Sequence, residues 1–186
     1  IYGGVHFVTN FVNPNKSFSI VSYKPPNLAH LKNLSQSFPN KISYFVGRNK
    51  ELKKIRNSLQ QQSVGAISQV TLSSLGGLGK TSLATEYYHR YRENYALCYW
   101  LRCGENLVSD WKRLSVDLGI PYQDGRSPSD YQTLVKQALV KCQECHKKPI
   151  LLVFDNAKDA KELEPYLLKG KGYHHLITCC DKASWP

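Results

Sequence analysis

The sequence predicts an α/β fold with three layers, in which helices cover both faces of a parallel sheet. Short apolar runs alternate along the chain with segments whose apolar residues recur at helical spacing. A glycine-rich turn joins one such run to a helix, and a later run of five apolar residues ends in an acidic residue. Strands that alternate with helices favour parallel pairing, because each helix carries the chain back across the sheet.

The glycine-rich turn lies between a strand expected at residues 67–73 and a helix expected from Leu83 onward. Glycine has no Cβ, so the backbone can direct successive N–H groups at one anion, and the helix adds the positive end of its dipole. We therefore expect a phosphate-binding loop, in which Lys80 reaches the β- and γ-phosphates and the Thr81 hydroxyl binds Mg²⁺. Ser74 stands where the strict motif has glycine. The residues expected to contact the nucleotide here are Gly76, Gly77, Leu78, Gly79, Lys80, Thr81 and Ser82.

The apolar run at 149–156 supplies the second part of the expected site. It predicts a strand buried on both faces that ends at Asp155, at the sheet edge where ligands bind in open α/β folds. We expect Asp155 to share Mg²⁺ with Thr81. Asn156 follows, where many ATPases carry the acid that polarises the attacking water. Since an amide cannot accept that proton, hydrolysis is expected to be slow, and Asp155 is the only catalytic candidate.

Two other segments are expected to be strands and three to be helices. The strands are residues 96–102 and residues 174–178, and the second ends at Thr178, which we expect to face the γ-phosphate. One helix begins after Gly47, and another follows the strand at 96–102. The third begins at Ser127, because this N-cap residue is followed by proline and, three positions on, by an acid.

Composition narrows the class of protein. The net charge of +11 fits either a polyanion-binding surface or lysine-rich solvated faces around a phosphate-binding fold. The basic residues are spread along the sequence without interleaved aromatics, so nucleic acid is not the favoured partner. No run approaches the roughly 18 apolar residues of a membrane helix. Six cysteines are too few for a disulfide scaffold, and with a nucleotide site they indicate the cytoplasm.

Cys142, Cys145 and His146 match the haem-attachment pattern C-x-x-C-H. Helical spacing nevertheless places Cys142 last on the apolar face of the third expected helix, so we expect core cysteines rather than ligands.

Residues 1–41 are rich in Pro, Asn and Ser and are expected to be a linker or the tail of a preceding region. The nucleotide-binding domain is expected at 42–186. Because the sequence begins with Ile and has no Met, we expect a fragment.

The order of these motifs resembles the NB-ARC family of the signal-transduction (STAND) P-loop NTPases, particularly prokaryotic members with tetratricopeptide repeats. Residues 45–51 resemble the family motif of two apolar residues and Gly-Arg-Glu-x-Glu, and 75–81 its phosphate loop. Residues 152–156 are similar to its Mg²⁺ strand and 176–178 to its sensor strand, although Cys180 stands where the family has Arg.

This resemblance implies further properties. Val46 and Arg48 would lie beside the adenine. The module would act as a switch, closed by ADP and opened by ATP, with self-association or protein partners through other regions. The fifth strand and the winged-helix region would lie beyond residue 186, which would leave the strand before the phosphate loop on a sheet edge, open to another chain.

The sequence is therefore interpreted as an ADP- or ATP-binding switch module of a larger signalling or scaffold protein, at most a slow ATPase, with Mg²⁺ as cofactor. Two alternatives stay open. One is an active AAA+ ATPase of the origin-recognition kind that acts on DNA, which the positive charge also fits. The other is a degenerate remnant that binds no nucleotide, suggested by Ser74 and Cys180.

Overall fold

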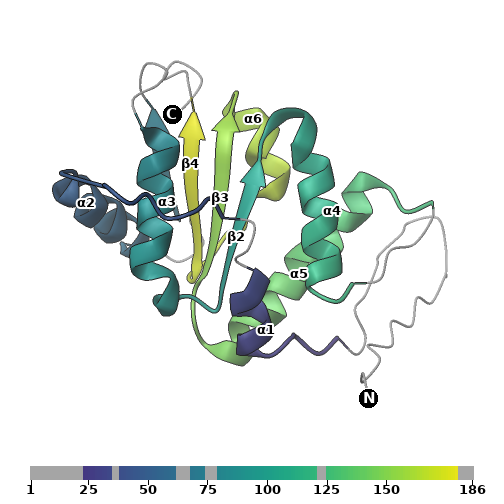
Figure 1. Cartoon of the computed structure of the whole chain (residues 1–186). Coiled ribbons are helices and arrows are strands. Elements are labelled where there is room, and N and C mark those ends of the chain that lie inside the picture. Colours follow the sequence, from purple (N-terminus) through teal and green to yellow (C-terminus); the bar gives the residue numbers. More distant parts are fainter. Residues whose placement is uncertain (1–22, 35–37, 62–67, 74–78, 121–124, 180–186) are drawn as a thin grey trace.

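The computed structural model describes residues 23–34, 38–61, 68–73, 79–120 and 125–179. Its centre is a four-stranded sheet in the order β1-β4-β3-β2, and all three strand pairs are parallel (Figure 1). The predicted strands are confirmed to within a residue or two at each end. The strands are β1 (Ser68–Ser73), β2 (Leu97–Arg102), β3 (Ile150–Ala157) and β4 (Tyr173–Cys179).

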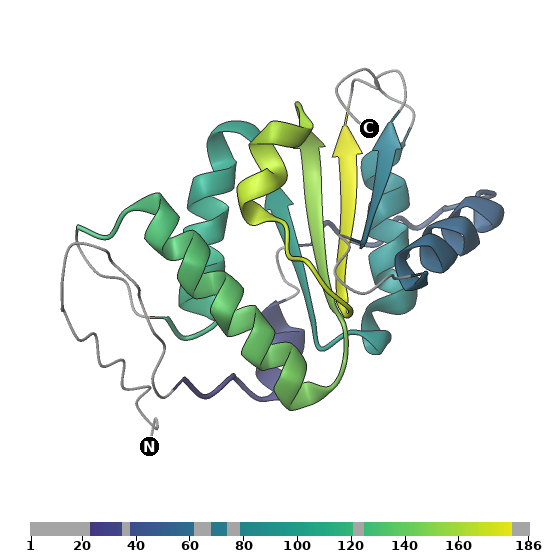
Figure 2. The same cartoon turned by 180° about the vertical axis from the view of Figure 1, so that it is seen from behind.

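Helices cover both faces of this sheet, which confirms the predicted three-layer α/β/α fold. Helices α2 (Asn49–Gln60) and α3 (Lys80–Tyr91) lie on one face. The view from behind shows α5 and α6 crossing the other face (Figure 2). The helices of that second layer are α1 (Leu28–Asn33), α4 (Leu107–Asp117), α5 (Pro128–His146) and α6 (Ala160–Leu163).

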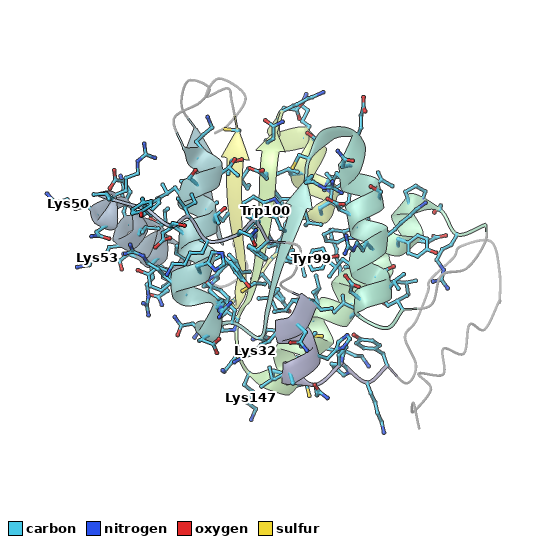
Figure 3. The ribbon with its side chains drawn as sticks, in the orientation of Figure 1. Lys32, Lys50, Lys53, Tyr99, Trp100 and Lys147 are labelled. Carbon is cyan, nitrogen blue, oxygen red and sulfur yellow. The ribbon has the colours of Figure 1, made fainter. Side chains whose placement is uncertain are left out.

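The side chains of the central strands alternate between two cores. In β2, Tyr99 belongs to the cluster with α4 and α5, whereas its neighbour Trp100 belongs to the cluster with α2 and α3 (Figure 3). Leu152 and Val153 divide in the same way along β3. Burial on both faces is the reason that these strands read as continuous apolar runs.

Local signals set the helix ends. The Ser127 hydroxyl accepts a hydrogen bond from the Asp130 backbone N–H, and the Asp130 carboxylate accepts one from the Ser127 N–H, so the predicted start of α5 is a complete capping box. After α4, Gly119 has φ 82°, a left-handed conformation that suits glycine and ends the helix. Cys142 is fully buried on α5, which confirms it as a core residue.

Residues 23–34 and Phe38 pack against the domain, although the division of the chain at residue 41 stays a prediction. Tyr23 and Leu31 are buried with α4 and α5, and Phe38 stacks on Tyr88 of α3. The Tyr23 hydroxyl donates a hydrogen bond to the Leu118 carbonyl at 2.9 Å. A composition typical of linkers does not reveal these contacts, because each partner lies far along the sequence.

Two features complete the fold. β1 pairs with β4 alone among the described strands, so it lies at the edge of the sheet that the resemblance predicted for it. Within the described part of the chain, every helix is too short or too polar to span a lipid bilayer.

Candidate functional site

The carboxyl ends of the parallel strands meet at one edge of the sheet, where the sequence places the candidate site. The pairing register sets Thr178 opposite Leu72 and Asp155 opposite Arg102. Helix α3, the next described element after β1, begins at the same edge. Of the expected phosphate-loop residues, Gly76, Gly77 and Leu78 lie outside the described residues, as does Cys180. Gly79, Lys80, Thr81 and Ser82 form the start of α3.

Two threonines, one from α3 and one from β4, donate to the same carboxylate oxygen of Asp155 in β3. The Thr81 hydroxyl donates a hydrogen bond to Asp155 Oδ1 at 2.9 Å, and the Thr178 hydroxyl donates one to the same atom at 2.6 Å. The backbone N–H of Asn156 donates to Thr178 Oγ1 at 2.8 Å. The structure thus brings together the residues expected to hold the metal and to sense the γ-phosphate.

The oxygen atoms at this point suit Mg²⁺. Mg²⁺ binds through one or two carboxylates together with phosphate oxygens and water, and a Ser or Thr hydroxyl is a common ligand after a phosphate loop. Asp155 is half-buried and Thr81 is exposed, so neither residue is sealed from solvent. The donor set therefore fits a magnesium ion bound between the protein and a phosphate.

The start of α3 suits an anion. Gly79 is its N-cap residue, with φ 72°, and it has no side chain to bond the first N–H groups of the helix. Helices leave those N–H groups without partners of their own, and the helix dipole adds positive potential there. The side chain of Lys80 is half-buried at the same position. This end of α3 can hold phosphate.

Arg48 lies beside this end of α3. Arg48 and Gly47 both have left-handed φ values, 50° and 81°, which turn the chain sharply before α2. As a result, Arg48 Nη1 lies 3.8 Å from the position that a Cβ on Gly79 would occupy. Val46 is 89% exposed, so its apolar side chain is available to a ligand. Both expected adenine-side residues therefore precede α2, and Arg48 lies beside Gly79.

Sequence reasoning missed Arg90, which ties this segment to α3. Its Nε donates to Glu86 Oε1 at 2.6 Å, and its Nη1 donates to Asn49 Oδ1 at 2.7 Å. Its guanidinium also lies over the Phe45 ring, 5.9 Å from the centroid. Glu86 and Arg90 are four residues apart, a spacing that indicates a helical ion pair. Nothing in the sequence indicated the link to Asn49.

The position after Asp155 carries no carboxylate. Asn156 has φ 62° at an irregularity in the pairing of β3 with β4, and its side chain is exposed. Asn tolerates this left-handed conformation better than most residues. The next acid, Asp159, accepts a hydrogen bond from the Glu162 backbone N–H and caps α6.

At the β2 end of this edge, the charged side chains form an ion pair with each other. Arg102 donates to both carboxylate oxygens of Asp110, at 2.9 Å and 2.6 Å. Burial raises the pKa of Asp110, but the hydrogen bonds from Arg102 outweigh it, so this pKa is below its usual value. Burial also raises the pKa of the Cys103 thiol. The backbone N–H of Cys103 donates a hydrogen bond to the Asp155 carbonyl. Cys103 is buried in the core with α4 and α5, where burial favours its neutral thiol form.

Comparisons with known proteins add a likeness in fold. No protein-family model and no curated protein matches the chain. The solved structure of Cdc6p from Pyrobaculum aerophilum superposes with a TM-score of 0.53 at 14% sequence identity, over 86% of this chain and 44% of that one. The ORC2 protein of Aeropyrum pernix, solved in its ADP form, gives a TM-score of 0.49 at 14% identity, over 86% and 47%.

The chain thus spans less than half the length of either structure. At such low identity the likeness to Cdc6p concerns the fold. Together with the strand order and the phosphate-loop sequence, it shows that this chain has the α/β/α fold of the P-loop NTPases.

Proposed function

We propose that this domain binds ADP or ATP together with Mg²⁺. The observation that carries the proposal is the carboxylate of Asp155, which accepts hydrogen bonds from Thr81 at the start of α3 and from Thr178 at the end of β4. Thr81 and Asp155 would hold the metal, and Thr178 would orient the carboxylate near the γ-phosphate. Mg²⁺ would neutralise phosphate charge.

The remaining expected residues take roles around this centre. Lys80 and the backbone of Gly76, Gly77, Leu78, Gly79 and Ser82 would bind the phosphates. Arg48, next to Gly79, would add a cation on the same side, and the exposed Val46 would contact the base. An apolar contact for the base and cations for the phosphates together suit a nucleotide better than a small anion.

Hydrolysis is proposed to be slow, because Asn156 cannot act as a general base and Asp159 caps a helix. A domain that binds ATP without turning it over quickly can report which nucleotide is bound.

The fold likeness to Cdc6p supports an ATPase of the origin-recognition kind more than a STAND switch. The motif at 45–51 and the position of Arg48 support the NB-ARC alternative. Multiple-turnover assays with labelled ATP separate them, since only the first predicts sustained turnover.

Calorimetric titration tests nucleotide binding directly. ADP and ATP, each with Mg²⁺, are titrated into the protein, into Lys80→Ala and into the matched control Lys171→Ala, whose side chain is exposed in the segment before β4. We expect micromolar binding that Lys80→Ala abolishes and Lys171→Ala leaves unchanged. A folded protein that binds neither nucleotide, or equal binding by all three proteins, would refute the proposal.

A further inference from the structure

Helix α2 presents a cationic face to solvent. Its apolar side chains Leu52, Ile55 and Leu59 are buried against the sheet and α3. On the opposite side, Lys50, Lys54 and Asn57 follow one another at helical spacing in a single line. Lys53 lies next to that line, and Figure 3 shows Lys50 and Lys53 projecting away from the sheet. All of these are exposed, and we define the cationic face of α2 as Lys50, Lys53, Lys54, Asn57, Ser58 and Gln60.

Few negative charges balance this face. Glu51 is the only acid of α2. The ion pairs between described residues join Lys32 to Glu93, Arg90 to Glu86, Arg92 to Glu93 and Arg102 to Asp110, and none includes a lysine of α2. The lysines of α2 are therefore available to an external anion.

Acidic residues are also scarce throughout the first half of the chain. Residues 1–91 hold eleven of the 25 Lys and Arg residues but only two of the 14 Asp and Glu residues. Lys41 and Arg48, just before α2, are exposed as well. The basic residues are spread along the whole sequence, but most of the acids come after residue 91. A marked asymmetry of charge indicates a surface for a polyanion.

The chemistry of the face favours nucleic acid over an acidic protein. Protein interfaces have an apolar centre and are depleted of lysine, whereas this face has three lysines and no apolar residue. Lys, Asn, Gln and Ser side chains are the usual partners of phosphate oxygens. A helix of 12 residues is about 18 Å long, and the same length of duplex carries on the order of ten phosphates.

We infer that the cationic face of α2 binds the phosphodiester backbone of double-stranded nucleic acid, without reading its sequence. This contact goes beyond nucleotide binding and does not depend on it, since the lysines of α2 belong to neither the metal site nor the phosphate loop. The backbone chemistry is shared by DNA and RNA, so both duplexes are tested.

The test compares two triple variants with the same change of charge. Lys50, Lys53 and Lys54 are replaced together by Gln, and in the control Lys161, Lys169 and Lys171 are replaced together by Gln. The control lysines are also exposed but lie on α6 and in the segment that leads to β4. Fluorescence anisotropy with a labelled short DNA duplex and an RNA duplex of equal length is recorded over a range of salt concentrations.

We expect the α2 variant to bind at least about tenfold more weakly near physiological salt. The slope of log affinity against log salt should fall by roughly 2 to 3, since each phosphate contact contributes about 0.9 for DNA. The control variant should keep most of the affinity, and thermal unfolding should show both variants folded. Lys80→Ala should bind the duplex like the unchanged protein, which separates this result from nucleotide binding.

Four outcomes would overturn the inference. The first three are the absence of binding to either duplex, an equal loss in both triple variants, and competition by polyglutamate as strong as that by unlabelled duplex. The second would show an effect of net charge alone, and the third a surface for an acidic protein. A strong preference for one duplex sequence would also contradict recognition of the backbone alone.

Discussion

At the scale of single residues, the proposed function makes Asn156 the position that limits the rate of ATP hydrolysis. Replacing it by Glu would place a carboxylate beside Asp155, where it could accept a proton from water. We expect Asn156→Glu to raise ATP turnover about tenfold or more. A left-handed φ suits Glu less well than Asn, so a stability loss of about 1 kcal/mol is expected as well. Asn156→Gln is the matched control. Equal turnover in both variants would mean that the lack of a carboxylate at position 156 does not limit ATP hydrolysis.

Thr178 donates a hydrogen bond to the Asp155 carboxylate, which we propose binds the metal. In Thr178→Val, Asp155 loses a hydrogen-bond donor and the part-buried Asn156 N–H loses its acceptor, with almost no change of volume. We expect a loss of about 1 to 3 kcal/mol in the free energy of unfolding and a weaker Mg²⁺ dependence of ATP affinity. Urea denaturation and titrations with and without Mg²⁺ measure both. Thr133→Val, on the exposed side of α5, should change neither, and unchanged Mg²⁺ dependence in Thr178→Val would contradict the assigned role.

At the scale of elements, the capping box at Ser127 sets the start of the longest helix. Ser127→Ala removes the oxygen that accepts from the Asp130 N–H, and such a loss typically costs about 1 kcal/mol. We expect a lower melting temperature in differential scanning calorimetry. Ser58→Ala, an exposed position in the middle of α2, serves as the control. If the two variants have the same melting temperature, the capping box contributes little to the stability of the protein.

The elements also differ in how they are stabilised. α2 and α3 are connected by Arg90, which bonds Asn49 at the start of one helix and Glu86 within the other. Glu86 Oε2 is buried and has no hydrogen-bond partner, so removing Arg90 would leave a buried carboxylate without its cation. The segment that carries Arg48 is therefore held in place by α3, the helix that carries Lys80 and Thr81.

At the scale of the whole molecule, stability should fall in mild acid. His174 is buried, its Nδ1 lies 2.9 Å from the Tyr95 hydroxyl, and burial lowers its pKa from 6.5 to about 4. Between these two values the unfolded chain binds more protons than the folded one, so lowering the pH favours unfolding. The expected loss is at most about 1.4 kcal/mol per pH unit, and it ends near pH 4.

Chemical denaturation at pH 7, 6 and 5 measures this loss. His174→Asn keeps a hydrogen-bond acceptor for Tyr95 but cannot titrate, so its stability should vary less with pH than that of the unchanged protein. His30→Gln, at an exposed position, should vary as the unchanged protein does. Identical pH dependence in all three proteins would show that buried His174 does not control acid stability.

The sequence by itself determined the elements and half of the candidate site. Four strands, the start of α5 and the phosphate-binding sequence depend on periodicity, capping and turn residues, and these act over a few neighbouring positions. The same signals identified Thr81 and Asp155, because each stands in a motif of its own. They also placed Cys142 in the core rather than in a metal site.

Only the tertiary structure decided which distant residues meet. It brought Thr178 to Asp155, Arg48 to Gly79 and Arg90 to Asn49, and it packed Tyr23 and Phe38 against the domain. Among the described residues, it left the lysines of α2 outside every ion pair. The contacts of these residues are made with partners tens of positions away in the chain, and a local sequence pattern does not encode such pairings. The packing of α2 on one side of the sheet gives the molecule its cationic face.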